Sequence, residues 1–207
     1  MNNTKENILI QAEAFFLKYG FRNVTMDDLC KEMGISKKTL YQFFQTKDSL
    51  VEACILGYME KEVIKVQQIR LKATDPVDAF YSLSKRALES LKEVSPFVIF
   101  DLQKNHPEIW KRFVNHDFEW QYNMLIINFN TGIEQGFYRP EINPAKVAKL
   151  FLLQTEGMLR PRIFEPESLE LLEAITLRDE LFLRSICTDL GLDRLKKLMA
   201  NHSPDKT

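Results

Sequence analysis

The chain has 207 residues, 45% of them hydrophobic, which is ample material for a packed core. Its 28 Lys and Arg nearly balance 29 Asp and Glu, so the net charge is −1 and any nucleic-acid binding must come from a local patch. Three widely spaced cysteines, Cys30, Cys54 and Cys187, form no CxxC pair, which argues against disulfides or zinc and favours a reducing, cytoplasmic location. We find neither a signal-peptide core nor an apolar run of roughly 18 residues that could span a bilayer.

The first two helices are predicted from apolar spacing and from their end signals. One helical face carries the apolar residues Ile8, Leu9, Ala12, Phe15, Phe16 and Tyr19. Gly20 supplies the stop for this helix. Thr25, with Asp28 three residues on, predicts a capping box that opens a second helix, and Gly34 ends that helix.

The remaining helices are predicted from caps and prolines. Ser36 caps a third helix over 37–44, and Thr46 caps a fourth over 47–71. Further helices are expected at 76–93, 96–104, 107–134, 144–160 and 173–190, with a short tail helix after Gly191. Because no segment shows a sustained period of two, the predicted fold class is all-α.

The stretch from Met26 to Phe43 has the spacing of a helix-turn-helix. With Met26 as position 1, apolar residues occupy positions 4, 8, 10, 15 and 18, which are Leu29, Met33, Ile35, Leu40 and Phe43. Gly34 falls at position 9, where a positive φ turns the chain. The small Cys30 falls at position 5, where the two helices cross closely. The spacing therefore predicts that 37–44 is a recognition helix.

The exposed side of this helix carries groups that suit the major groove of DNA. These are Lys37, Lys38, Thr39, Tyr41 and Gln42, followed by Lys47. Lysines neutralise phosphates and hydroxyls fix the register on the backbone. Gln42 suits an adenine edge, and Thr25 at a helix N-terminus suits a phosphate. The alternative is a solvated amphipathic helix, and the complete turn pattern favours DNA binding.

The segment from Thr25 to Leu50 resembles the DNA-binding signature of TetR-family transcriptional regulators. Leu40-Tyr41, Phe44, Lys47 and Leu50 fall where that family places its Leu-Tyr, Phe, Lys and Leu, and the resemblance covers about residues 5–55. Two positions depart from the family pattern. Cys30 replaces the usual alanine, and Lys38 stands where a small residue is frequent, which adds a possible phosphate contact.

The resemblance implies an all-α regulator with an N-terminal three-helix DNA-binding domain and a C-terminal domain for ligand binding and dimerisation. Domain boundaries are expected at 1–46 for the helix-turn-helix domain, 47–71 for the connecting helix and 72–207 for the C-terminal domain. The resemblance also implies a homodimer that binds a palindromic double-stranded operator. Most such proteins are repressors that a small ligand releases from the DNA. The DNA-contacting positions carried over are Thr25, Lys37, Thr39, Tyr41, Gln42 and Lys47.

The helices 144–160 and 173–190 are apolar nearly all round, so each is expected to bury two sides. One side can face the chain's own core and the other a second copy in a two-fold four-helix interface. The candidate interface residues are Leu150, Leu153, Met158, Leu181, Phe182 and Ile186. The alternative is a pair of fully internal core helices.

The segment 97–129 is rich in aromatic residues with polar groups among them, as in a mainly apolar ligand pocket. The candidate lining residues are Phe97, Phe100, Trp110, Phe113, His116, Trp120 and Asn123, with Gln154 from a later helix. They would suit a small apolar or aromatic effector. A plain aromatic core would give the same pattern.

Neither catalytic nor cofactor chemistry is indicated. His106 and His116 lie ten residues apart, which is not a metal-binding spacing on a helix, and no nucleophile elbow or phosphate-binding glycine loop is present. The chain is therefore expected to be neither an enzyme nor a cofactor- or metal-binding protein. Two alternatives stay open: a DNA-bound regulator controlled by a protein partner, and an all-α enzyme with a DNA-binding head.

Overall fold

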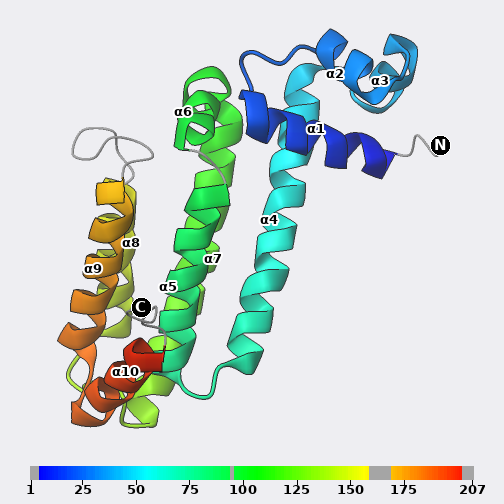
Figure 1. Cartoon of the computed structure of the whole chain (residues 1–207). Coiled ribbons are helices and arrows are strands. Elements are labelled where there is room, and N and C mark those ends of the chain that lie inside the picture. Colours follow the sequence, from blue (N-terminus) through cyan, green and yellow to red (C-terminus); the bar gives the residue numbers. More distant parts are fainter. Residues whose placement is uncertain (1–4, 94–95, 159–168, 202–207) are drawn as a thin grey trace, which may run out of the picture. The chain divides into compact units, whose positions relative to one another are not determined.

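The structure is a computed structural model that describes residues 5–93, 96–158 and 169–201. Within these ranges the chain forms helices and no strand, which confirms the all-α prediction (Figure 1). The elements are α1 (Lys5–Tyr19), α2 (Met26–Met33), α3 (Lys37–Phe43), α4 (Lys47–Lys72), α5 (Pro76–Glu93), α6 (Pro96–Asn105), α7 (Pro107–Glu134), α8 (Pro144–Met158), α9 (Leu169–Ile186) and α10 (Asp189–Asn201).

The chain divides into two compact units. The first, here called the head, comprises Met1–Lys65 and Glu93–His116, and the second, here called the body, comprises Val66–Lys92 and Asp117–Thr207. The head is therefore built from two separate stretches of sequence. The long helices α4 and α7 each contribute residues to both units.

The core of the head forms where α1, α2, α3 and the start of α4 meet. Phe16, Leu29, Leu40 and Leu50 are almost completely buried in it. The later stretch of the head contributes to the same cluster through Val98, Leu102 and Ile109. The helix-turn-helix is thus supported from one side by residues that follow it in sequence by about fifty positions or more.

Polar contacts also fix α6 and the start of α7 to the rest of the head. The buried carboxylate of Asp101 accepts a hydrogen bond of 2.7 Å from the backbone N–H of Arg22. Nδ1 of His106, which is also buried, lies 2.9 Å from Oδ1 of Asp48 in the first turn of α4. Since buried polar groups are costly without partners, the hydrogen bond to Asp101 favours this docked arrangement.

The body has a separate aromatic core. Phe80 stacks with Phe182 at a centroid distance of 5.6 Å, and both contact Phe129. The fully buried Tyr138 meets Phe129 edge-on, and its hydroxyl lies 2.9 Å from the carbonyl oxygen of Pro76 at the start of α5. The interlocked rings hold α5, α7 and α9 together.

Two consecutive residues of α9 form a buried ion pair on the side of the helix that meets α8. Nε of Arg178 lies 2.6 Å from Oδ1 of Asp179, and the two side chains are only 13% and 9% exposed. The Arg178 guanidinium also donates to the Thr155 hydroxyl and lies 4.3 Å from the centre of the Phe151 ring. Burial lowers the pKa of Arg178 and raises the pKa of Asp179, so desolvation outweighs the attraction between the two charges.

The predicted boundaries of the last two helices were wrong. The expected helix over 173–190 is α9, which spans Leu169–Ile186, and the tail helix begins at Asp189 and not after Gly191. Thr188 caps α10, because its hydroxyl accepts the N–H of Gly191 at 3.3 Å. Gly191 lies inside α10, and a Cβ at this position would come within 2.2 Å of the Phe137 carbonyl oxygen. The glycine serves close packing and does not end a helix.

Candidate nucleic-acid interface

The N-terminus of α2 is organised by the predicted capping box, which the structure confirms. The Thr25 hydroxyl accepts the N–H of Asp28 at 3.1 Å, and the Asp28 carboxylate accepts the N–H of Thr25 at 3.0 Å. The hydrogen bonds from Thr25 lower the pKa of the Asp28 carboxyl. Thr25 is exposed at a helix N-terminus, where backbone dipoles favour an anion such as a phosphate.

The turn between α2 and α3 also has the predicted geometry. Gly34 adopts φ 63° and its N–H donates to the carbonyl oxygens of Cys30 and Lys31. Ser36 caps α3 by accepting the N–H of Thr39 at 3.1 Å. Cys30 is buried at the crossing, and burial raises the pKa of its thiol. The two helices are therefore held at a fixed angle with α3 at the surface.

The lysines of α3 differ in their surroundings. Nζ of Lys37 lies 2.7 Å from Oδ2 of Asp27 on α2, and this hydrogen bond raises the pKa of Lys37. Lys38 is exposed, and among the described side chains none forms an ion pair with it. The free ammonium group of Lys38 is thus available for a phosphate, whereas Lys37 must share its charge with Asp27.

The outer side of α3 presents Tyr41 and Gln42 to solvent, as predicted. Thr39 is half-buried, and its hydroxyl lies 2.8 Å from the Ser36 hydroxyl at the start of the helix. The expected inward position of Phe43 was wrong, because its side chain is 40% exposed. Phe44 occupies the core position instead, since it follows Leu40 by four residues and so lies on the same helical face.

Lys47 lies at the start of α4, beside the second stretch of the head. Its ammonium group donates to the carbonyl oxygen of Arg22 at 3.4 Å. Partial burial lowers its pKa, although the nearby carboxylates of Asp101, Asp48 and Asp28 oppose this shift. Lys47 therefore helps to hold the head together, and its contact with DNA stays a prediction.

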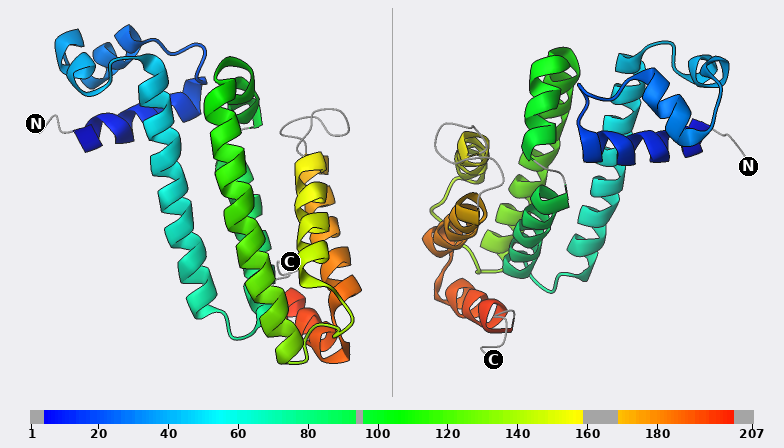
Figure 2. Two further views of the ribbon diagram at one scale, coloured as in Figure 1. Left: turned by 180° about the vertical axis from the view of Figure 1, so that it is seen from behind. Right: turned by 45° about the horizontal axis from the view of Figure 1, so that its top comes forward.

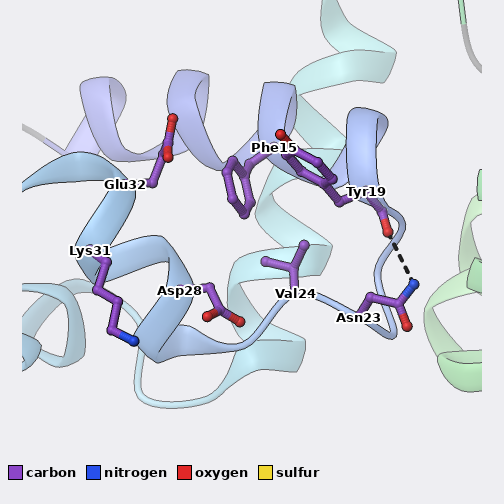
Figure 3. A pocket seen from close by; sticks show the side chains of 7 residues that line it. All are labelled: Phe15, Tyr19, Asn23, Val24, Asp28, Lys31 and Glu32. Carbon is purple, nitrogen blue, oxygen red and sulfur yellow. Dashed lines mark hydrogen bonds between the residues drawn. The ribbon is translucent and has the colours of Figure 1, made fainter.

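A shallow pocket of about 490 Å³ opens on the head between α1 and α2 (Figure 3). Its lining consists of Phe15, Tyr19, Asn23, Val24, Asp28, Lys31 and Glu32. Figure 3 shows Phe15, Tyr19 and Val24 as its apolar part and the charged side chains of α2 beside them. None of the residues predicted to line an effector pocket takes part in it.

The predicted effector-pocket residues are divided between the head and the body. Trp110 packs against the core of the head, so we withdraw it from the candidate pocket, and Phe100 is 44% exposed on α6. Trp120 is half-buried, and Asn123 and Gln154 are exposed on the body. The side chains of Phe97, Phe113 and His116 lie outside the described residues.

The predicted interface residues divide into two groups. Leu150, Leu153 and Leu181 are 52%, 64% and 57% exposed on α8 and α9, which lie side by side in both views of Figure 2. Phe182 and Ile186 are instead buried in the body's own core, so we withdraw them from the interface. Leu177, which is 56% exposed one turn before Leu181, joins the exposed set. Met158, at the end of α8, is half-buried.

Within the described ranges, no cluster of three or more His, Cys, Asp or Glu side chains could hold a metal ion. Among the described helices, none combines the length and the apolar character that a membrane crossing requires.

Comparison with known proteins gives three relevant likenesses. In the transcriptional repressor KstR2 of Mycobacterium tuberculosis, 146 aligned residues are 22% identical and cover 69% of this chain and 73% of that protein. A TetR transcription regulator from Haloarcula marismortui superposes with a TM-score of 0.76 at 19% identity, over 88% of this chain and 97% of that one. A transcriptional regulator from Saccharomonospora viridis, solved in complex with choline, superposes with a TM-score of 0.68 at 14% identity, over 88% of this chain and 97% of that one.

The head therefore has the fold of a helix-turn-helix DNA-binding domain attached to an all-helical body. Residues 8–54 match the family described as bacterial regulatory proteins, tetR family. This segment is therefore a helix-turn-helix domain of that family's type, and the chain is a DNA-binding transcriptional regulator.

Proposed function

We propose that the protein is a homodimeric repressor that binds a palindromic operator through two copies of α3. The observation that carries this proposal is the exposed side of α3, where Lys38, Tyr41 and Gln42 project from a helix held by the Gly34 turn. Lys38 suits phosphate neutralisation, the Tyr41 hydroxyl suits a phosphate oxygen and Gln42 suits an adenine edge. An operator-binding repressor requires no catalysis. It would act in the cytoplasm, where operators are accessible.

The proposed dimer interface is the exposed leucine face of α8 and α9. Four exposed leucines on two neighbouring helices would bury apolar surface against the same residues of a second copy. A two-fold axis through this face would form a four-helix bundle. Two heads related by such an axis suit half-sites separated by one turn of DNA, about 34–36 Å.

We further propose that an effector bound by residues 72–207 releases the DNA. Helix α4 contributes to both units, so it is the element through which a change in the body would reach the head. A ligand that switches the protein nearly completely must favour the released state by about 5.5 kcal/mol. The choline complex of the Saccharomonospora viridis protein supports a ligand site in this fold, without identifying the effector here.

The proposal is tested by selecting bound DNA from a random pool with the purified full-length protein. We expect a palindromic consensus with half-sites about one helical turn apart, bound with a strong salt dependence. In a matched set, Lys47→Ala and Tyr41→Ala should weaken binding to every sequence, whereas Gln42→Ala should relax preference at one position per half-site. Recovery of no consensus, or wild-type binding by all three variants, would overturn the assignment.

A second candidate is a regulator whose signal comes from a protein partner. The interlocked rings of Phe80, Phe129 and Phe182 favour it, because they fill the centre of the body with the chain's own side chains. Small-molecule screening by thermal shift separates the two candidates. An effector that raises the melting temperature and releases the selected operator supports the first candidate, whereas a protein fraction that alone releases it supports the second.

A further inference from the structure

The recognition helix ends in an exposed aromatic ring that the proposed DNA contacts do not use. Phe43 is the last residue of α3 and its side chain is 40% exposed, whereas the adjacent Phe44 is 3% exposed. The ring of Phe44 completes the core, and Lys5 lies 5.6 Å from its centre. Phe43 therefore presents apolar surface to solvent on the helix that carries the DNA-reading groups.

Helix geometry places Phe43 on a flank of the outward face. Successive residues turn by about 100°, so the buried Leu40 and Phe44 define the inward direction and Gln42 points opposite to it. Tyr41 and Phe43 then lie on the two flanks, each about 80° from the inward direction. In the major groove such flank residues lie where the outer base edges meet the backbones, so their side chains can reach either.

The two flanks differ in chemistry. Tyr41 carries a hydroxyl that can donate to a phosphate oxygen, but Phe43 has no polar atom and gains nothing from that contact. The apolar group that DNA offers in the major groove is the C5 methyl of thymine. We propose that Phe43 packs against a thymine methyl and so selects thymine at one position of each half-site. This inference rests on the proposed placement of α3 in the groove.

The charges around Phe43 favour DNA over an apolar protein partner. Residues 37–47 contain three lysines and no acidic residue, so the ring sits in a locally positive segment. A polyanion is attracted to such a segment, and removal of the ring from water against a methyl group adds a contribution that does not depend on salt.

The test compares thymine with deoxyuridine, which differs only by the missing methyl group. Starting from the selected operator, each thymine of a half-site is replaced in turn by deoxyuridine, and dissociation constants are measured at one fixed salt concentration. For the wild type we expect one position where the replacement weakens binding about fourfold, as for the loss of one buried methyl group. In Phe43→Ala that position should lose its sensitivity, while Phe43→Leu should retain part of it.

A matched control is Ile64→Ala, which removes another exposed apolar side chain, 55% exposed on α4 of the head. It should show the wild-type deoxyuridine profile. If Phe43→Ala keeps the same sensitive position as the wild type, or if no position is sensitive in the wild type, the thymine assignment is wrong although the operator binding stands. If the selection yields no operator, the groove placement itself fails, which distinguishes the two failures.

Discussion

The carboxylate of Asp27 on α2 lies 2.7 Å from the ammonium nitrogen of Lys37 on α3. The contact joins the two helices of the DNA-binding motif at the point where a phosphate backbone is expected. Both side chains are at least half exposed, so the pair contributes little to folding stability. Its main effect is to reduce the positive charge that Lys37 can offer to DNA.

Asp27→Asn should therefore strengthen DNA binding. The substitution removes a negative charge near the phosphates and frees Lys37, so the slope of log affinity against log salt should steepen by about 1. Titrations at several salt concentrations measure this slope, and the melting temperature should hardly change. Asp193→Asn is a matched control, because it breaks the similarly exposed Lys196–Asp193 pair on α10. Equal slopes for Asp27→Asn and the wild type would contradict the expectation.

Thr25→Ala should weaken both folding and operator binding, because the hydroxyl caps α2 and faces the expected phosphate. The loss of an N-cap costs about 1 kcal/mol of unfolding free energy, whereas Thr25→Ser, which keeps the hydroxyl, should retain most of it. Denaturant titration and operator affinity are the two readouts. If Thr25→Ser lowered the unfolding free energy and the operator affinity as much as Thr25→Ala, the loss of the hydroxyl would not be the cause of these effects.

The capping box also predicts a pH dependence. Because the pKa of Asp28 is lowered in the folded protein, its charged form stabilises the fold at pH values above the ordinary carboxyl pKa. That stabilisation is lost as the pH falls through the lowered folded value. The unfolding free energy of the wild type should therefore exceed that of Asp28→Asn at pH 7, and the two should converge in acid. A constant difference across this range would exclude the carboxylate's charge as the cause.

Asp101→Ala should destabilise the head. The substitution leaves the backbone N–H of Arg22 without its acceptor in a partly buried setting, at a cost of about 1–3 kcal/mol. Asn105→Ala is the matched comparison, because it removes the other donor to Asp101 and leaves the Arg22 contact intact. In chemical denaturation of the full chain, Asp101→Ala should have a lower unfolding free energy than Asn105→Ala. The reverse order would show that the Arg22 contact is not the important one.

Removing one partner of the Arg178–Asp179 pair should lower the unfolding free energy strongly, whereas replacing both partners by apolar residues should lower it little. Arg178→Met alone strands a buried carboxylate and should cost about 3 kcal/mol, whereas Arg178→Met with Asp179→Leu should return to within about 1 kcal/mol of the wild type. Unfolding free energies of the wild type, both single variants and the double variant form the required cycle. Simple additivity of the two single effects would contradict a coupled buried pair.

Leu153→Glu and Leu181→Glu should each convert the proposed dimer to monomer, because burying an unpaired charge in an apolar interface is unfavourable. Leu190→Glu, which alters an equally exposed leucine on α10, should leave the dimer intact. Analytical ultracentrifugation gives the mass of each variant at matched concentration. Monomeric wild type, or an unchanged mass in both α8 and α9 variants, would exclude this face as the interface.

Local signals were sufficient to predict the start of the chain. The capping box at Thr25, the turn at Gly34 and the cap at Ser36 each depend on residues within four positions, and the structure contains all three. The apolar spacing placed Phe43 wrongly at a core position, since the adjacent aromatics Phe43 and Phe44 are equally apolar in sequence. Only their angular position relative to Leu40 decides which of them is buried.

Residue roles that depend on tertiary contacts could not be predicted from the sequence. Gly191 resembles a helix stop, but its role is set by the Phe137 carbonyl oxygen some fifty residues earlier. Trp110 resembles a pocket residue, yet it packs on a core made mostly of residues 8–54. A single sequence does not show which distant segments meet, so both assignments required the structure.

Because Val98, Leu102 and Ile109 complete the core of the head, the DNA-binding unit is not a detachable N-terminal module. A chimera that transplanted only residues 1–46 onto the body of another regulator would carry a core with one side uncovered. The transplant would have to include α6 and the first turns of α7, or the recipient would have to supply an equivalent surface. Exchange of operator specificity between such proteins is therefore simpler by substitutions on α3 than by recombination at the start of α4.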